Sequence, residues 1–149
     1  MQMNDPADVT LLLVEDDLGH ARLIEKNLLR ANVTNKVVKC SDGQQAVDYL
    51  FGEGDYGGQQ PASPLLVLLD LNLPVLDGYQ VLERMKNDEA TKRIPVVMLT
   101  TTDDPREVHR CYELGCNVYV TKPVDYGQFS EAIRKLGLFI SVVTVSDEE

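Results

Sequence analysis

The stretch LLVLLDLNLPVLDGYQVL, residues 65–82, runs five consecutive apolar residues directly into an acidic one. A continuous apolar run of this length predicts a strand that is buried on both faces, as the strands of a parallel sheet are. The acid that ends the run is Asp70, and an unpaired charge is costly to remove from water at such a place. Asp70 therefore either shapes a surface turn or has its charge held there for a chemical purpose.

The rest of the chain repeats this alternation of an apolar run and a helical pattern. Apolar runs predict strands at 10–14, 35–41, 65–69, 96–99 and 117–121. Apolar residues at helical spacing, with turn residues at the ends, predict helices at 18–32, 42–51, 77–88, 103–115 and 125–137. Five strand–helix units with short connections predict an α/β domain, in which helices cover both faces of a doubly wound parallel sheet.

The length of 149 residues fits one domain, which we expect to cover residues 9–137. Residues 1–8 are a short polar leader, and residues 52–64 are a Gly- and Pro-rich loop before the third strand. Residues 138–149 are first apolar and then acidic, and we expect them to be an extension too short to be an output domain.

Composition narrows the function classes. A formal net charge of −10 argues against direct binding to nucleic acid, which depends on clustered Lys and Arg. The sequence offers no apolar span that could cross a membrane and no signal peptide, so we expect a cytoplasmic protein without membrane insertion. Cys40, Cys111 and Cys116 form no C-x-x-C pair, which favours buried, reduced thiols. His20 and His109 are expected to be surface helix residues without a chemical role.

Polar side chains follow the apolar runs at the points where the strands end. The carboxyl ends of parallel strands meet at one edge of a sheet, where such folds bind ligands. The residues expected at this edge are Glu15, Asp16, Asp17, Asp70, Asn72, Thr100, Tyr119 and Lys122.

Such a group has a clear chemical use. Neighbouring carboxylates repel one another unless a cation holds them, and Mg²⁺ prefers oxygen ligands. A lysine can pair with a phosphoryl oxygen, and a carboxylate can act as a nucleophile that forms an aspartyl phosphate. The pattern therefore favours phosphoryl transfer to Asp70, with one Mg²⁺ ion as cofactor.

Four segments in this order, LLLVEDD (11–17), LLVLLDLNLPVLDGYQVL (65–82), IPVVMLTT (94–101) and VYVTKP (118–123), resemble the receiver domain of two-component response regulators, a CheY-like domain. The resemblance implies a flavodoxin-like fold with strand order 2-1-3-4-5. It also implies roles for individual residues. The phosphoacceptor would be Asp70, and the metal ligands would be Glu15, Asp16, Asp70 and the Asn72 carbonyl. Lys122 would contact the phosphate, and the peptide bond Lys122–Pro123 would be cis. The switch residues would be Thr100 and Tyr119.

Other interpretations remain open for several of these residues. Glu15, Asp16 and Asp17 are also the acids that a helix N-terminus favours, and which of them would bind a metal is undecided. Thr100 is also a plausible helix cap, and Tyr119 a half-buried strand aromatic. A different class, the Mg²⁺-dependent phosphohydrolases with an aspartate nucleophile, usually needs a second aspartate two residues after the first, where this chain has an asparagine.

The resemblance also implies how the protein signals. A receiver domain accepts its phosphoryl group from a histidine kinase, is not a classical enzyme, and then changes a surface that here would include residues 103–115 and 126–136. The loop at 52–64 and the apolar extension resemble single-domain regulators paired with bacterial and cyanobacterial phytochrome kinases. We expect a homodimer formed through the last helix and residues 138–145, although the extension could instead pack on its own domain. The expected dimer contacts are Phe129, Ile133, Leu136, Leu138, Phe139 and Ile140.

Overall fold

Five strands form one parallel sheet in the computed structural model, which describes residues 9–30, 33–101, 103–122, 127 and 131. The strands are β1 (Thr10–Val14), β2 (Val37–Cys40), β3 (Leu65–Asp70), β4 (Val96–Thr100) and β5 (Val118–Thr121). Their order is β2-β1-β3-β4-β5, and every neighbouring pair is parallel. The predicted fold class and strand order are confirmed.

Strand β3 lies at the centre of the sheet and is buried along its whole length. Leu65, Val67 and Leu69 pack on one side, while Leu66 and Leu68 pack on the other. Successive side chains of a strand point to opposite faces, so both faces of this strand must be apolar to be covered. The uninterrupted apolar run before Asp70 is explained by this placement.

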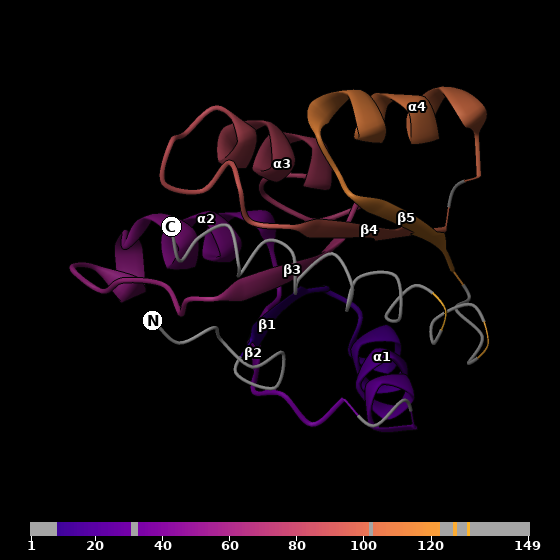
Figure 1. Ribbon diagram of the computed structural model, residues 1–149, viewed down its shortest axis with the longest axis horizontal. Helices are drawn as coiled ribbons and strands as arrows, with labels where there is room; N and C mark the ends of the chain where they lie inside the picture. The colour runs from indigo at the N-terminus through magenta and orange to yellow at the C-terminus, as the bar shows by residue number, and fades with distance from the viewer. Residues whose placement is uncertain (1–8, 31–32, 102, 123–126, 128–130, 132–149) are drawn as a thin grey trace, which may run out of the picture.

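Four α-helices and one 3₁₀ turn are described. They are α1 (Leu18–Arg30), α2 (Gly43–Phe51), the 3₁₀ turn η2 (Gly54–Tyr56), α3 (Gly78–Lys86) and α4 (Pro105–Leu114). Figure 1 shows α2, α3 and α4 on one side of the sheet and α1 on the opposite side. Ala21, Ile24 and Leu28, which repeat at helical spacing in the sequence, are the apolar residues that α1 buries against the sheet. Within the described residues, no helix is long and apolar enough to cross a membrane.

The helix ends follow the sequence signals closely. Asp104 caps α4 by accepting a hydrogen bond from the Arg106 backbone, Pro105 is the first helical residue, and Gly115 ends the helix with φ +106°. The helix α1 ends at Arg30, two residues before the end of its predicted range, and η2 lies inside the segment predicted as a loop at 52–64. The leader, the extension at 138–149 and nearly all of the predicted helix at 125–137 lie outside the described residues.

The order of the strands also defines where a ligand would bind. From β1 the chain continues to β2 on one side, and it then returns to form β3 on the other side of β1. Such a reversal of strand order opens a crevice beyond the carboxyl ends of the two central strands. Glu15 follows β1 and Asp70 ends β3, so both lie at this crevice.

Candidate functional site

Asp70 is the last residue of β3, and the backbone around it is held by hydrogen bonds. The N–H of the next residue, Leu71, donates to the carbonyl of Leu99 on β4 at 3.2 Å. The Asp70 carboxylate in turn accepts the N–H of Asn72 at 3.4 Å. Asp70 is only 5 % exposed, so its carboxyl group is presented from a rigid and largely water-excluded position.

The loop after Asp70 ends at Gly78, where the backbone passes too close to β3 for any residue with a side chain. The N–H of Gly78 donates to the Leu71 carbonyl at 2.8 Å, which brings the start of α3 against the end of β3. A Cβ atom at this position would lie 2.5 Å from the Asp70 carbonyl oxygen and 2.7 Å from the Leu71 Cα, closer than real contacts allow. Asp77 directly before it caps α3 with a capping box to Gln80. The loop from Asp70 to α3 is therefore closed tightly against the site.

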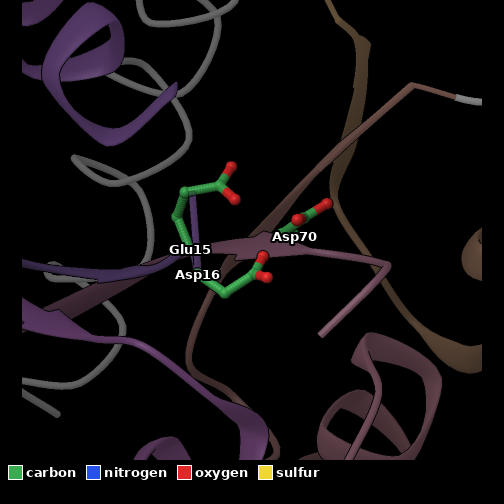
Figure 2. Close-up of side chains that lie close together, drawn as sticks. All are labelled: Glu15, Asp16 and Asp70. Atoms are coloured by element: carbon green, nitrogen blue, oxygen red, sulfur yellow. The ribbon is translucent and has the colours of Figure 1, made fainter. Parts of the chain in front are cut away.

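Three carboxyl groups meet at this edge of the sheet. Glu15 and Asp16 follow β1, and each offers an oxygen within 4.8 Å of the others and of an Asp70 oxygen. Figure 2 shows the three side chains around a shared space, two from the end of β1 and one from the end of β3. Glu15 is buried and Asp16 is exposed, so the cluster reaches from the interior to the surface.

Asp17, the third acid after β1, has a different position. Its carboxylate accepts the backbone N–H of His20 at 3.0 Å, which makes Asp17 the residue that caps α1. The hydrogen bond from the His20 backbone N–H is the largest cause that lowers the pKa of the Asp17 carboxyl group, and the backbone N–H of Gly19 lowers it further. Glu15 and Asp16 therefore face Asp70, whereas Asp17 caps α1.

Lys122 brings the one positive charge that reaches this cluster within the described part of the chain. It follows β5, and its Nζ contacts Glu15 Oε1 and lies 3.5 Å from Asp70 Oδ2. Its side chain is only 5 % exposed, which matches the buried carboxylates that it faces. The predicted convergence of Lys122 with the acids of β1 and β3 is confirmed in position.

The charges in the cluster do not balance. Burial is the largest cause that raises the pKa of Asp70 to about 6; the Lys122 ammonium opposes this rise, and the nearby Glu15 carboxylate adds to it. Three carboxylates and one ammonium leave a negative site built from hard oxygen ligands. Such a set of ligands fits a divalent cation such as Mg²⁺.

Thr100 and Tyr119 form a pair beside the cluster. Thr100 ends β4 and is fully buried. Burial, the largest cause, raises the pKa of the Tyr119 phenol of β5 to about 12, and the Thr100 side chain acts on this phenol so as to lower its pKa. The backbone carbonyl of Thr100 also accepts the N–H of Lys122, which ties the two strand ends together. Thr100 therefore lies between the lysine and the aromatic residue.

The remaining predicted residues have simpler outcomes. Asn72 is exposed and lies next to Asp70, with its backbone N–H directed at the carboxylate. Pro123, with the predicted cis peptide bond, and the predicted dimer contacts lie outside the described residues; these contacts are Phe129, Ile133, Leu136, Leu138, Phe139 and Ile140. Among the described peptide bonds the cis bond is Ser63–Pro64, before β3.

His20 is the residue that the sequence interpretation missed. It was expected to be a surface residue without chemistry, and its side chain is indeed 45 % exposed. Its Nδ1 nevertheless lies 3.3 Å from Lys122 Nζ and 3.9 Å from Glu15 Oε1. One signal in the sequence could have indicated this position: His20 comes three residues after Asp17, on the first turn of the helix that begins at the sheet edge. His109, by contrast, is exposed on α4 and pairs with Glu113 at 3.2 Å.

Comparisons with known proteins agree with this geometry. The model of the response regulator receiver domain matches residues 11–134. Among curated proteins, the chain is 36 % identical over 137 residues to the probable methanogenesis regulatory protein FilR2 of Methanothrix harundinacea, covering 91 % of this chain and 84 % of that protein. It is 40 % identical over 112 residues to response regulator Rcp1 of Synechocystis, covering 75 % of each.

Solved structures give the same result. A response regulator receiver domain from Rhodospirillum rubrum is 57 % identical, with a TM-score of 0.74 over 89 % of this chain and 94 % of that one. The bacteriophytochrome response regulator RtBRR is 43 % identical, with a TM-score of 0.78, and the match covers 86 % of this chain and 77 % of that one. The Mn²⁺-bound form of Rcp1 is 35 % identical, with a TM-score of 0.72, and the match covers 85 % of this chain and 90 % of that one. With the family model matching most of its length, and with the acids and the lysine at the matching strand ends, the chain belongs to the response regulator receiver domain family.

Proposed function

We propose that this protein is a phosphorylation switch that accepts one phosphoryl group on Asp70 from a sensor histidine kinase. The observation that carries the proposal is the position of Asp70, buried at the end of β3 between the Glu15–Asp16 pair and the Lys122 ammonium. Receiver domains are signalling domains that work with histidine kinases, and the chain belongs to that family.

The metal site in this proposal consists of Glu15, Asp16, Asp70 and the backbone carbonyl of Asn72. The first three supply carboxylate oxygens within 4.8 Å of one another, which supports one divalent ion. A solved structure of the related Rcp1 is the Mn²⁺-bound form. When bound, Mg²⁺ would neutralise negative charge on the carboxylates and on the transferred phosphoryl group. The exposed position of Asp16 leaves the outer side of the site open to the phosphoryl donor.

The reaction needs a nucleophile and a counter-charge, and the chain supplies both. A carboxylate oxygen of Asp70 forms the new P–O bond while the P–N bond of the kinase's phosphohistidine breaks, and the leaving imidazole keeps the electron pair and takes up a proton. The Lys122 ammonium, 3.5 Å from Asp70 Oδ2, is placed to pair with a phosphoryl oxygen. Phosphoryl transfer depends mainly on positioning and charge neutralisation, and these residues would supply both.

The signal would leave the site through Thr100 and Tyr119. The buried Thr100 side chain is close enough to Tyr119 to oppose the rise that burial causes in the pKa of its phenol. A phosphoryl group on Asp70 would add acceptor oxygens that attract the Thr100 hydroxyl, and Tyr119 would respond to its movement. Tyr119 lies on β5, and its backbone N–H donates to the Tyr112 hydroxyl of α4 at 3.2 Å, so the surface that changes would include α4 and β5. The proposal also assigns residues 126–136 to this surface, as membership of the family implies. Output is then binding to another protein.

The pathway and the assembly are part of the same proposal. Two of the similar structures are named as phytochrome regulators: the bacteriophytochrome response regulator RtBRR and the phosphorylated cyanobacterial phytochrome response regulator RcpA. RcpA is 38 % identical, with a TM-score of 0.73, and the match covers 89 % of this chain and 93 % of that one. We place this protein in a phytochrome-type light-sensing pathway, in the cytoplasm where kinases have ATP, and as a homodimer through the last helix and residues 138–145.

Phosphorylation in vitro tests the proposal. Incubated with Mg²⁺ and acetyl phosphate, the protein should gain the mass of one phosphoryl group, which then hydrolyses slowly. Asp70→Asn and chelation of the metal should abolish the gain, whereas Asp55→Asn, at an exposed position in η2, should not. Transfer from an autophosphorylated phytochrome kinase should be faster than from a chemoreceptor-type kinase. Many turnovers of a phosphate ester would instead support the phosphohydrolase alternative.

A further inference from the structure

His20 occupies the outer side of the Lys122–Glu15 pair. Its Nδ1 lies 3.3 Å from Lys122 Nζ and 3.9 Å from Glu15 Oε1. The side chains of Lys122 and Glu15 are 5 % and 1 % exposed, whereas that of His20 is 45 % exposed. The imidazole is therefore the partly solvated member of an otherwise buried group.

The chemistry of the contact fixes the direction of the hydrogen bond. A lysine ammonium carries three N–H donors and no acceptor, so Nδ1 of His20 must be the acceptor and the ring proton must lie on Nε2. Three acceptors then surround Lys122 Nζ: Glu15 Oε1 and His20 Nδ1 as close contacts, and Asp70 Oδ2 at 3.5 Å. Three donors face three acceptors.

The position of His20 is itself fixed by the backbone. Its N–H donates to the Asp17 carboxylate at 3.0 Å, and the N–H of Ala21 donates to the Asp17 carbonyl at 2.9 Å. The first turn of α1 thus holds His20 at a set distance from the acids that end β1.

We propose that His20 is a positioning residue for Lys122. A lysine side chain is a flexible four-carbon stem, and a buried ammonium with a single strong partner would turn toward that partner. Glu15 and His20 together occupy two of its N–H groups, which leaves the third directed at Asp70. The inference rests on the proposed function in one respect, since the group that the third N–H would meet is the phosphoryl group on Asp70.

Two substitutions separate positioning from packing. His20→Leu keeps most of the side-chain bulk and removes the acceptor, whereas His20→Asn keeps an acceptor oxygen in the place of Nδ1. His109→Leu on α4 is the matched control, because that histidine is 74 % exposed and contacts Glu113 rather than the site. Urea unfolding of each variant measures what the change does to stability alone.

At saturating acetyl phosphate and Mg²⁺, His20→Leu should slow the first-order phosphorylation rate by about five- to tenfold, the equivalent of one lost hydrogen bond. His20→Asn and His109→Leu should stay within about twofold of the original protein, and the acetyl phosphate concentration for half-saturation should hardly change. An unchanged rate in His20→Leu, or an equal loss in His20→Asn, would overturn the proposal.

A second measurement does not depend on phosphorylation. The ¹⁵N chemical shifts of the His20 ring in the metal-free protein at pH 8 should identify the tautomer with its proton on Nε2. The Lys122 ammonium protons should exchange faster with water in His20→Leu than in His20→Asn. A ring proton on Nδ1 would contradict the hydrogen bond directly. If the original protein accepted no phosphoryl group, the proposed function would fail while these spectra still tested the contact.

Discussion

Lys122 Nζ lies 3.5 Å from Asp70 Oδ2, and the two side chains, from the ends of β5 and β3, are almost completely buried. The same Nζ contacts Glu15, so one ammonium serves two buried carboxylates, and the exposed Asp16 adds a third nearby. Burial is the largest cause that raises the pKa of Asp70 to about 6. Without a metal ion, the buried charge of Asp70 therefore lowers the stability of the fold.

Asp70→Asn should stabilise the metal-free protein. The substitution keeps the shape and removes one buried negative charge, and a pKa rise from 3.8 to about 6 corresponds to about 3 kcal/mol at neutral pH. We expect the free energy of unfolding in urea to rise by about 1–3 kcal/mol. Asp55→Asn, on the exposed η2 turn, should leave it nearly unchanged, and Mg²⁺ should stabilise the original protein more than Asp70→Asn.

The pH dependence of that gain follows from the direction of the pKa shift. Below pH 4 Asp70 is protonated in both the folded and the unfolded chain, so the gain should vanish. Between pH 4 and 6 only the unfolded chain releases the proton, and the original protein loses stability as the pH rises. Above pH 6 the gain should stay constant. A gain that is the same at pH 4 and pH 7 would refute the electrostatic explanation.

Asp16→Ala and Asp17→Ala should have opposite effects, although the residues are neighbours. Asp16 is exposed and faces the acid cluster, so its loss should weaken Mg²⁺ binding at least tenfold and hardly change the urea midpoint. Asp17 caps α1, so its loss should lower the urea midpoint and leave Mg²⁺ affinity within about threefold. Calorimetric titration and urea unfolding measure the two quantities. Similar losses of Mg²⁺ affinity in both would show that Asp17 also holds the ion.

The sequence was sufficient for the strands and for the acids at their ends. Strands β1, β3 and β4 are apolar runs with polar residues at or directly after their carboxyl ends, and parallel strands bring these ends together whatever the loops between them do. That is why the sequence alone groups Glu15, Asp70 and Lys122. The ends of α4 could be predicted in the same way, with Asp103 or Asp104 as the N-cap and Gly115 as the last residue, because caps satisfy backbone groups within their own helix.

Contacts between distant segments could not be read in the same way. His20 reaches the site because its turn of α1 faces Lys122, and the direction of a side chain on a first helical turn depends on how the helix leaves the sheet. The closeness of Gly78 to the Asp70 carbonyl, and the positive φ of Val75, are likewise properties of a folded loop. Neither has a periodic signal in the sequence.

Gly78→Ala should disturb the site although residue 78 bears no functional group. The new Cβ would lie 2.5 Å from the Asp70 carbonyl oxygen, and backbone atoms cannot move aside as a flexible side chain can. We expect a loss of about 2 kcal/mol or more in urea unfolding and slower phosphorylation. Gly57→Ala is the control, because its nearest contact is the Gly54 carbonyl at 3.3 Å. Equal, small effects in both variants would show that the loop adjusts freely.

Val75→Gly should stabilise the protein. Val75 has φ +69° and is 72 % exposed, so a β-branched side chain occupies the left-handed region and gains little from packing. Relief of this strain should raise the free energy of unfolding by about 1 kcal/mol. Val75→Ala removes the branch and keeps the Cβ, so it should recover less than half of the gain. A destabilised Val75→Gly protein would mean that the exposed valine makes a favourable contact.

The cysteines should be unreactive in the folded protein and should make its stability fall at high pH. Burial, the largest cause in each case, raises the pKa of Cys40 to about 11 and that of Cys116 to about 12, and it also raises that of Cys111. At pH 8 a disulfide reagent should label all three thiols in urea, and the folded protein at least a hundredfold more slowly.

The sign of the pH effect follows from the same shift. Between pH 9 and 11 the unfolded chain releases the Cys40 proton and the folded chain keeps it, so the folded state loses stability as the pH rises. Cys40→Ala lacks this group, and the stability difference between the original protein and that variant should therefore shrink across this range. If the two proteins lost stability in parallel from pH 9 to 11, the Cys40 thiol would have to ionise as readily in the core as in water.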